Sequence, residues 1–253
     1  MDFLWTWLPF LLVSILAQFI LAPIIVRFTS SHPACPEFEA AGMGQLPPDV
    51  AANLGRFVYA MNAEGFVLVG FFRQLAYMRN VGFYLALMKH PVHADMVYAM
   101  EMFANNGIVP VRSAHIEFCT DFTDGKEICT NNSKQPSVHK AHPGMQVHRF
   151  PEAQNPHLLH AIHRRLCATL APGVAHVPMA EGMELFHLSY GTVKDVRKQA
   201  EFGYYYLDEK RNVFRPTLKG ACRITWRLAW PVGALRRSRM RKNARATMLS
   251  LGF

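Results

Sequence analysis

The segment Phe3–Val26 reads FLWTWLPFLLVSILAQFILAPIIV and contains no charged residue. It has about the length of a helix that crosses the hydrocarbon core of a bilayer. Pro9 and Pro23 lie near its ends, where a proline costs a spanning helix few hydrogen bonds. We therefore predict an uncleaved, single-pass transmembrane anchor over residues 1–28, which tethers the rest of the chain to a membrane.

Two other interpretations of this segment are open. A cleaved signal peptide normally begins with a basic region and has a shorter apolar core, whereas here Asp2 is the only charged residue before the run. A buried helix of a soluble protein normally has a polar face, which this segment lacks. Arg27 follows the run and no Lys or Arg precedes it, so the positive-inside rule predicts that the domain lies in the cytoplasm.

The net charge of +9 is concentrated at the C-terminal end. From Arg215 onward the chain has ten basic residues and no acidic one, while the remainder has about as many basic as acidic residues. We therefore expect residues 213–253 to form a basic tail, and any affinity for polyanions to reside there.

Five cysteines are scattered along the chain without a CxxC pair. The odd number and the spacing indicate a reducing compartment rather than a disulfide framework. One pair stays open, because Cys119 and Cys129 flank the turn at Asp124-Gly125. A two-residue loop places them on opposite faces of a hairpin, and a three-residue loop with a bulge places them on the same face, where a disulfide can form.

The segment between the anchor and the tail predicts an α+β domain over residues 49–212, preceded by a linker over residues 29–48. Pro48 begins a short amphipathic helix that ends before Gly65. Apolar or alternating runs then predict an antiparallel sheet of four or five strands. These runs are Phe66–Phe72, Val81–Met88, Ala94–Phe103, Ser113–Phe122 and Glu127–Asn132.

A loop over Gln135–Pro151 and two covering helices complete the predicted domain. Asn155-Pro156 is typical of a helix start, and this helix is expected to reach Leu170. The second helix is expected from Met183 to Tyr205.

The segment Thr217–Leu235 predicts a basic amphipathic helix. Its cations and its tryptophans fall in adjacent rows at a spacing of four, a pattern typical of helices that lie in the plane of a membrane interface. In the alternative interpretation, the tryptophans fill the core and the arginines are solvated. The expected contacts with anionic lipid are Lys219, Arg223, Trp226, Arg227, Trp230, Arg236, Arg237, Arg239, Arg241 and Lys242.

Signals for catalysis are weak. The chain has twelve histidines but no HExxH spacing, and it has no nucleophile elbow, Walker loop or GxGxxG motif. His139, His142, His157 and His160 are the best candidate metal ligands. On a helix, no more than two of His157, His160 and His163 face the same way, so a loop histidine would have to complete a site. We expect no metal, no cofactor and no catalytic residue.

Three hypotheses of function remain. The first is a membrane-anchored, non-catalytic binding or scaffolding protein whose basic tail contacts anionic lipid headgroups and whose domain binds an unidentified protein partner. The second is nucleic-acid binding by the same arginines, which is less favoured because aromatic residues are not interleaved with the charges. The third is a histidine-dependent metalloenzyme.

Overall fold

The computed structural model describes residues 2–78, 81–105 and 110–253. The chain forms two compact units. The first unit comprises Met1–Cys35, Ser137–Lys140 and Val193–Ser238, and the second unit comprises Pro36–Pro136, Ala141–Thr192 and Arg239–Phe253. The boundaries differ from those expected from the sequence, because segments far apart in the chain join the same unit.

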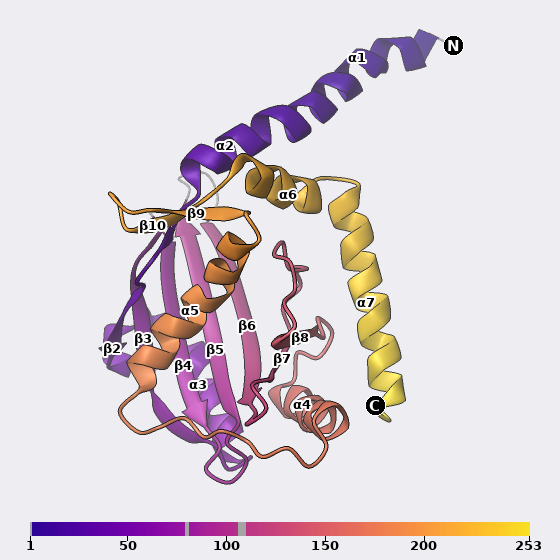
Figure 1. The fold of residues 1–253 in the computed structure, drawn as a ribbon. Helices are drawn as coiled ribbons and strands as arrows, with labels where there is room; N and C mark the ends of the chain where they lie inside the picture. The colour runs from indigo at the N-terminus through magenta and orange to yellow at the C-terminus, as the bar shows by residue number, and fades with distance from the viewer. Residues whose placement is uncertain (1, 79–80, 106–109) are drawn as a thin grey trace. The chain divides into compact units, whose positions relative to one another are not determined.

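The second unit is built on one sheet of seven strands within the described residues, in the order β2-β3-β4-β5-β6-β7-β8 (Figure 1). All neighbouring strands are antiparallel except β7 and β8, which are parallel. The strands are β2 (Glu37–Ala41), β3 (Val67–Met78), β4 (Val81–Lys89), β5 (Met96–Asn105), β6 (Pro110–Asp121), β7 (Glu127–Asn131) and β8 (Met145–Arg149).

Both faces of this sheet are covered, which explains why the central strands are almost continuously apolar. On β4, Ala86 and Met88 face a core formed with helices α3 (Pro48–Asn62) and α4 (Pro156–Leu170). Leu85 and Leu87 face the opposite way and pack with Leu188, in the part of helix α5 (Glu184–Glu201) that belongs to the second unit. Alternate residues of one strand therefore serve two cores.

Helices α3 and α4 of the second unit begin and end where the sequence predicts. Helix α3 buries the apolar row that includes Val50, Leu54 and Met61. Asn155 caps α4 by accepting a hydrogen bond from the backbone N–H of His157 at 2.9 Å. The mixed α+β class is thus confirmed for the second unit.

Several sequence expectations need correction. The count of four or five strands is wrong, because β2 lies within the expected linker and β8 lies within the expected loop. Strand β2 pairs with β3 at the sheet edge, so this part of residues 29–48 belongs to the fold. The helix expected to reach Tyr205 ends at Glu201, because Gly203 has φ of 73° and Tyr205 starts strand β9 (Tyr205–Asp208).

The first unit begins with an apolar helix. It consists of α1 (Asp2–Leu16), a π-helical turn η1 (Ala17–Leu21) and α2 (Ala22–Thr29). By length and composition, Trp7–Thr29 can span a membrane, with a mean hydropathy of 2.4, and it is the one such helix in the described part of the chain. Only 6% of its apolar window is buried, so the helix is not packed in the interior of the structure.

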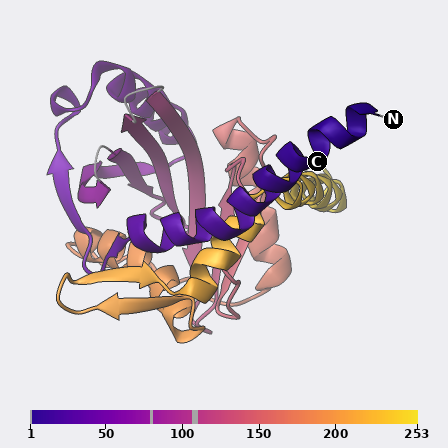
Figure 2. The same ribbon diagram turned by 90° about the horizontal axis from the view of Figure 1, so that it is seen from above.

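The first unit also contains a small antiparallel sheet and a helix that follows it (Figure 2). The sheet order is β1-β10-β9, with β1 (His32–Pro33) and β10 (Val213–Pro216). Helix α6 (Leu218–Leu228) follows β10 directly. The single helix expected over Thr217–Leu235 is interrupted at Trp230-Pro231, because proline lacks the N–H of a helix interior, and α7 (Val232–Ser250) begins after it.

Candidate functional site

The start of helix α6 is fixed by a cap and by a close backbone approach. Thr217 Oγ1 accepts a hydrogen bond from the N–H of Gly220 at 3.0 Å, which caps the helix. A Cβ atom on Gly220 would lie 1.9 Å from the carbonyl oxygen of Tyr204, so only glycine permits this contact. The sequence thereby sets α6 directly against the residue that precedes β9.

Helix α6 lies alongside the apolar N-terminal helix within the first unit, as both views show (Figures 1 and 2). The rings of Phe19 and Trp226 are 5.0 Å apart. At the end of α2, Arg27 donates to the carbonyl of Pro216 and Arg215 donates to the carbonyl of Phe28, each at 3.0 Å. These bonds tie the end of the apolar helix to β10, and hence to the start of α6.

A cavity of about 550 Å³ lies between these two helices. One side is apolar and comes from the N-terminal helix, while the other is basic and aromatic and comes from α6 and Tyr204. We call it the basic cavity, and its lining residues are Phe19, Pro23, Tyr204, Lys219, Cys222, Arg223, Thr225, Trp226 and Arg227.

Two cations of the basic cavity are held by an aromatic ring instead of a carboxylate. Lys219 Nζ lies 5.0 Å and Arg223 Cζ lies 4.7 Å from the centre of the Tyr204 ring. Among the described residues, neither cation forms an ion pair, and Arg223 Nε is buried without a hydrogen-bond partner. Both retain donors that an added anion can use.

Two further arginines raise the positive charge beside the cavity. Arg227 Nη1 donates to the carbonyl of His139 at 2.8 Å, and Arg236 Nη2 donates to the carbonyl of Ser137 at 2.6 Å. Burial, and then the charges of Arg223 and Arg236, together lower the pKa of Arg227 to about 10. The guanidinium still stays charged at neutral pH, so the cluster adds to a strongly positive field.

Large apolar side chains are exposed next to these cations. Leu218, Trp226, Trp230 and Leu235 have exposed fractions of 56%, 55%, 68% and 67%. Indole and leucine side chains beside arginines are typical of helices at a membrane interface. The alternative interpretation from the sequence, in which the tryptophans fill the core, does not fit the exposure of Trp226 and Trp230.

The predicted lipid contacts therefore divide into groups. Lys219, Arg223, Trp226 and Arg227 line the basic cavity, and Trp230 is exposed beyond the end of α6. Arg236 and Arg237 belong to the first unit, whereas the segment of α7 that carries Arg239, Arg241 and Lys242 belongs to the second unit. Sequence reasoning missed Phe19, Pro23 and Tyr204, because only tertiary packing brings them to α6.

The second unit contains a buried polar network centred on Asp95, which is fully buried. Thr120 Oγ1 donates to Asp95 Oδ1 at 2.6 Å, and Arg164 Nη1 lies 3.1 Å from both carboxylate oxygens. His160 Nε2 lies 3.6 Å from Asp95 Oδ2. His163 joins the network through Thr120, at 2.9 Å from Nε2. We call these five residues the Asp95 network, and it fixes α4 to β6 and the β4–β5 turn.

Electrostatics within the Asp95 network explain its charge states. Burial opposes ionisation of Asp95, but the neighbouring His160 and His163, the Thr120 hydroxyl and the Arg164 charge lower its pKa to about 2. Burial lowers the pKa of His163 to about 3, against the attraction of Asp95. His163 is therefore neutral at physiological pH, and Arg164 is the permanent cation beside Asp95.

The Asp95 network is not a nucleophilic site. Cys167 Sγ lies 3.6 Å from His163 Nε2, as in a cysteine–histidine pair. Cys167 has an exposed fraction of only 3%, and burial raises the pKa of its thiol to about 11. A reactive cysteine needs a low pKa and access to substrate, so this arrangement serves structure.

Three of the four histidines considered as metal ligands lie beside carboxylates, two of them beside the same one. His157 Nδ1 lies 2.6 Å and His160 Nδ1 lies 3.5 Å from the two carboxylate oxygens of Glu64. His139 binds Asp195 through Nδ1 in the first unit. Within the described residues, the three-ligand group that could hold an ion contains no histidine; it consists of Glu117, Cys119 and Cys129.

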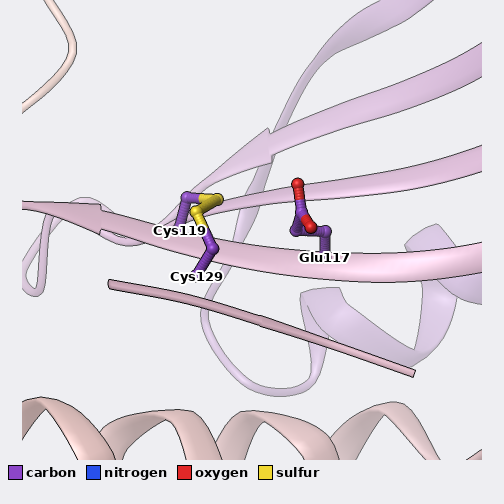
Figure 3. A group of neighbouring side chains, drawn as sticks. All are labelled: Glu117, Cys119 and Cys129. Carbon is purple, nitrogen blue, oxygen red and sulfur yellow. A yellow bond between two sulfur atoms is a disulfide. The ribbon is translucent and has the colours of Figure 1, made fainter. Parts of the chain in front are cut away.

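Cys119 and Cys129 form a disulfide (Figure 3). They are directly opposite each other on the paired strands β6 and β7. Strand β6 ends at Asp121 and β7 starts at Glu127, so five residues form the loop between them. The loop is thus longer than either loop considered from the sequence, and the two side chains share one face of the sheet. The sequence leaves this pairing open, and the structure shows it formed.

No protein-family model, curated protein or solved structure matches this chain.

Proposed function

We propose that the chain is a membrane-anchored binding protein that holds an anionic phospholipid headgroup in its basic cavity. The observation that carries the proposal is the pair of cations Lys219 and Arg223, which have no carboxylate partner among the described residues and lie beside an apolar helix long enough to span a bilayer. A phosphate group supplies the missing negative charge, and acyl chains match the apolar wall.

The chemistry of the cavity favours a lipid over a soluble anion. Its apolar wall is formed by Phe19 and Pro23 of the apolar helix, where acyl chains of a surrounding bilayer would lie. The exposed Trp226 and Trp230 favour the headgroup level of a membrane. A free phosphate would use the cations but would leave this apolar surface uncovered.

Nucleic acid is the less favoured ligand for the same arginines. Single-stranded nucleic acid binds to grooves in which aromatic rings alternate with cations along the backbone path. Here the exposed aromatic residues continue an apolar surface instead, and the cations gather around Tyr204.

The orientation of the anchor is part of the proposal. Arg27 after the apolar helix and the ten basic residues from Arg215 onward favour the cytoplasmic side for the domain. The Cys119–Cys129 disulfide is typical of an oxidising compartment and argues the other way. Protease protection of a C-terminal tag decides between them: we expect digestion only in inverted vesicles, and digestion only in right-side-out vesicles would refute the cytoplasmic orientation.

Native mass spectrometry of the full-length protein released from nanodiscs tests the headgroup site. Nanodiscs with equal amounts of phosphatidylcholine and phosphatidylglycerol should yield protein that retains phosphatidylglycerol preferentially. Because a cation near an anionic surface contributes about 1 kcal/mol, Arg223→Gln or Lys219→Gln should each reduce this preference about fivefold.

Matched variants separate local charge from general effects. Arg211 is exposed on the turn between β9 and β10, away from the cavity lining, so Arg211→Gln should leave the preference unchanged. Arg223→Lys keeps the charge and should restore most of the preference. Equal retention of the two lipids by the unmodified protein would refute the proposal, and tighter retention of a nucleic acid oligomer than of phosphatidylglycerol would favour the alternative.

A further inference from the structure

Three potential metal ligands lie on one face of the β6–β7 hairpin in the second unit. Cys119 and Cys129 are directly opposite each other, with their Cα atoms 4.3 Å apart, and Glu117 is two residues before Cys119 on the same face (Figure 3). The two sulfur atoms and a Glu117 carboxylate oxygen all lie within 4.8 Å of one another. These donors come from two hydrogen-bonded strands, so their positions are set by the register of the sheet.

The donor types and their spacing suit zinc. Thiolate and carboxylate are both zinc ligands, and a Zn–S bond of about 2.3 Å in tetrahedral geometry holds two sulfur atoms about 3.8 Å apart. Opening the S–S bond lets the sulfur atoms separate to that distance by side-chain rotation, since the Cα atoms already face each other across the strands. Three protein ligands leave a fourth position for water or another carboxylate.

The surroundings of the three donors resemble a second coordination shell. Asn131 Nδ2 donates to Glu117 Oε2 at 2.6 Å, which orients the carboxylate. Glu127 Oε1 lies 3.6 Å from Cys129 Sγ and is within reach of the fourth position. Asp121 and Glu127 are paired across the same two strands and add two further carboxylates to the hairpin. Their negative charge favours a divalent cation.

We propose that Glu117 and the reduced cysteines Cys119 and Cys129 bind Zn²⁺, so that this hairpin has two mutually exclusive states, a disulfide and a zinc dithiolate. Reduction by a low-molecular-weight thiol breaks the S–S bond, forms two protein thiols and oxidises two thiol molecules to their disulfide. Zinc then displaces the two thiol protons to solvent and forms two Zn–S bonds. The site is independent of the basic cavity, which lies in the other unit.

Metal content of the full-length protein in nanodiscs tests the zinc site. After reduction, incubation with zinc and removal of unbound metal, we expect one zinc per chain, and in the oxidised protein we expect none. Cobalt should give a thiolate-to-Co²⁺ charge-transfer band in the reduced protein only. The comparison of two redox states needs no substitution, so it cannot be confused with misfolding. Equal zinc content in the reduced and oxidised protein would overturn the proposal.

Substitutions then assign the ligands. Cys119→Ser and Cys129→Ser should each abolish the cobalt band, and Glu117→Gln should retain the band but weaken zinc binding at least tenfold, an effect as large as those of second-shell changes. Cys35→Ser removes an exposed thiol of the first unit and should leave zinc content unchanged. Retention of one zinc by a folded Cys119→Ser, Cys129→Ser double variant would place the metal elsewhere and refute the assignment.

Discussion

Replacing His163 by glutamine should reduce the acid sensitivity of the second unit. The His163 side chain is fully buried between two hydroxyl groups, with Nε2 2.9 Å from Thr120 Oγ1 and Nδ1 3.0 Å from Thr130 Oγ1. Thr120 donates its only hydroxyl hydrogen to Asp95, so it accepts from His163 Nε2–H. Nδ1 of the neutral ring then accepts from Thr130, and protonation of Nδ1 would break that bond and bury a charge.

The size of the effect follows from linkage between protonation and folding. The pKa of His163 is about 3 in the folded protein and 6.5 in the unfolded chain. The unfolded chain therefore binds an extra proton as the pH falls below 6.5. Stability is fully present above that pH and decreases toward lower pH by as much as about 1.4 kcal/mol per pH unit. Between about pH 7 and about pH 5, His163 should cost about 2 kcal/mol.

Hydrogen exchange is the suitable assay, because all four tryptophans are in the first unit and their fluorescence does not report on the second. Mass spectrometry of peptides from α4, corrected for intrinsic exchange rates, gives the free energy of opening at each pH. Other histidines contribute equally to the unmodified protein and to His163→Gln, so the difference between the two pH slopes isolates His163. Equal slopes would refute the account of a buried neutral imidazole, whatever the stability of the variant at neutral pH.

Three further predictions concern single residues. Asp95→Asn should destabilise the second unit by about 3 kcal/mol, because it leaves Arg164 beside a neutral group; exchange in α4 peptides unchanged from the unmodified protein would contradict this. Gly220→Ala should displace α6 from Tyr204 and reduce the trypsin resistance of the first unit, while α4 exchange stays the same. Asn155→Ala should cost about 1 kcal/mol through loss of the α4 cap, and Asn155→Asp should recover it; equal losses in both variants would argue against capping.

The elements that the sequence predicts well are those with a strong pattern of their own. The alternating segment that becomes β6 and the capped helix α4 both appear near their expected bounds. Strands β2 and β8 escape prediction because EFEAA and MQVHR are short and lack a run of β-branched residues, and their pairing partners β3 and β7 determine them. The sheet, rather than local preference, makes these segments strands.

The candidate sites show the same division. The row of Lys219 and Arg223 with Trp226 beside it can be recognised from helical spacing alone. Tyr204, which holds both cations, and Phe19, which meets Trp226, lie outside the helix that carries the cations and have no local signal. The Asp95 network was missed for the same reason, since its members come from the β4–β5 turn, β6 and α4.

Quenching of tryptophan fluorescence by brominated lipids tests the proposed headgroup site most directly. In a variant with Trp5→Phe and Trp7→Phe, the remaining tryptophans are Trp226, which lines the basic cavity, and Trp230, which is exposed beyond the end of α6. Brominated phosphatidylglycerol should quench more strongly than brominated phosphatidylcholine at the same mole fraction, and Arg223→Gln should remove the difference. Equal quenching by the two lipids before that substitution would contradict an anionic headgroup held beside α6.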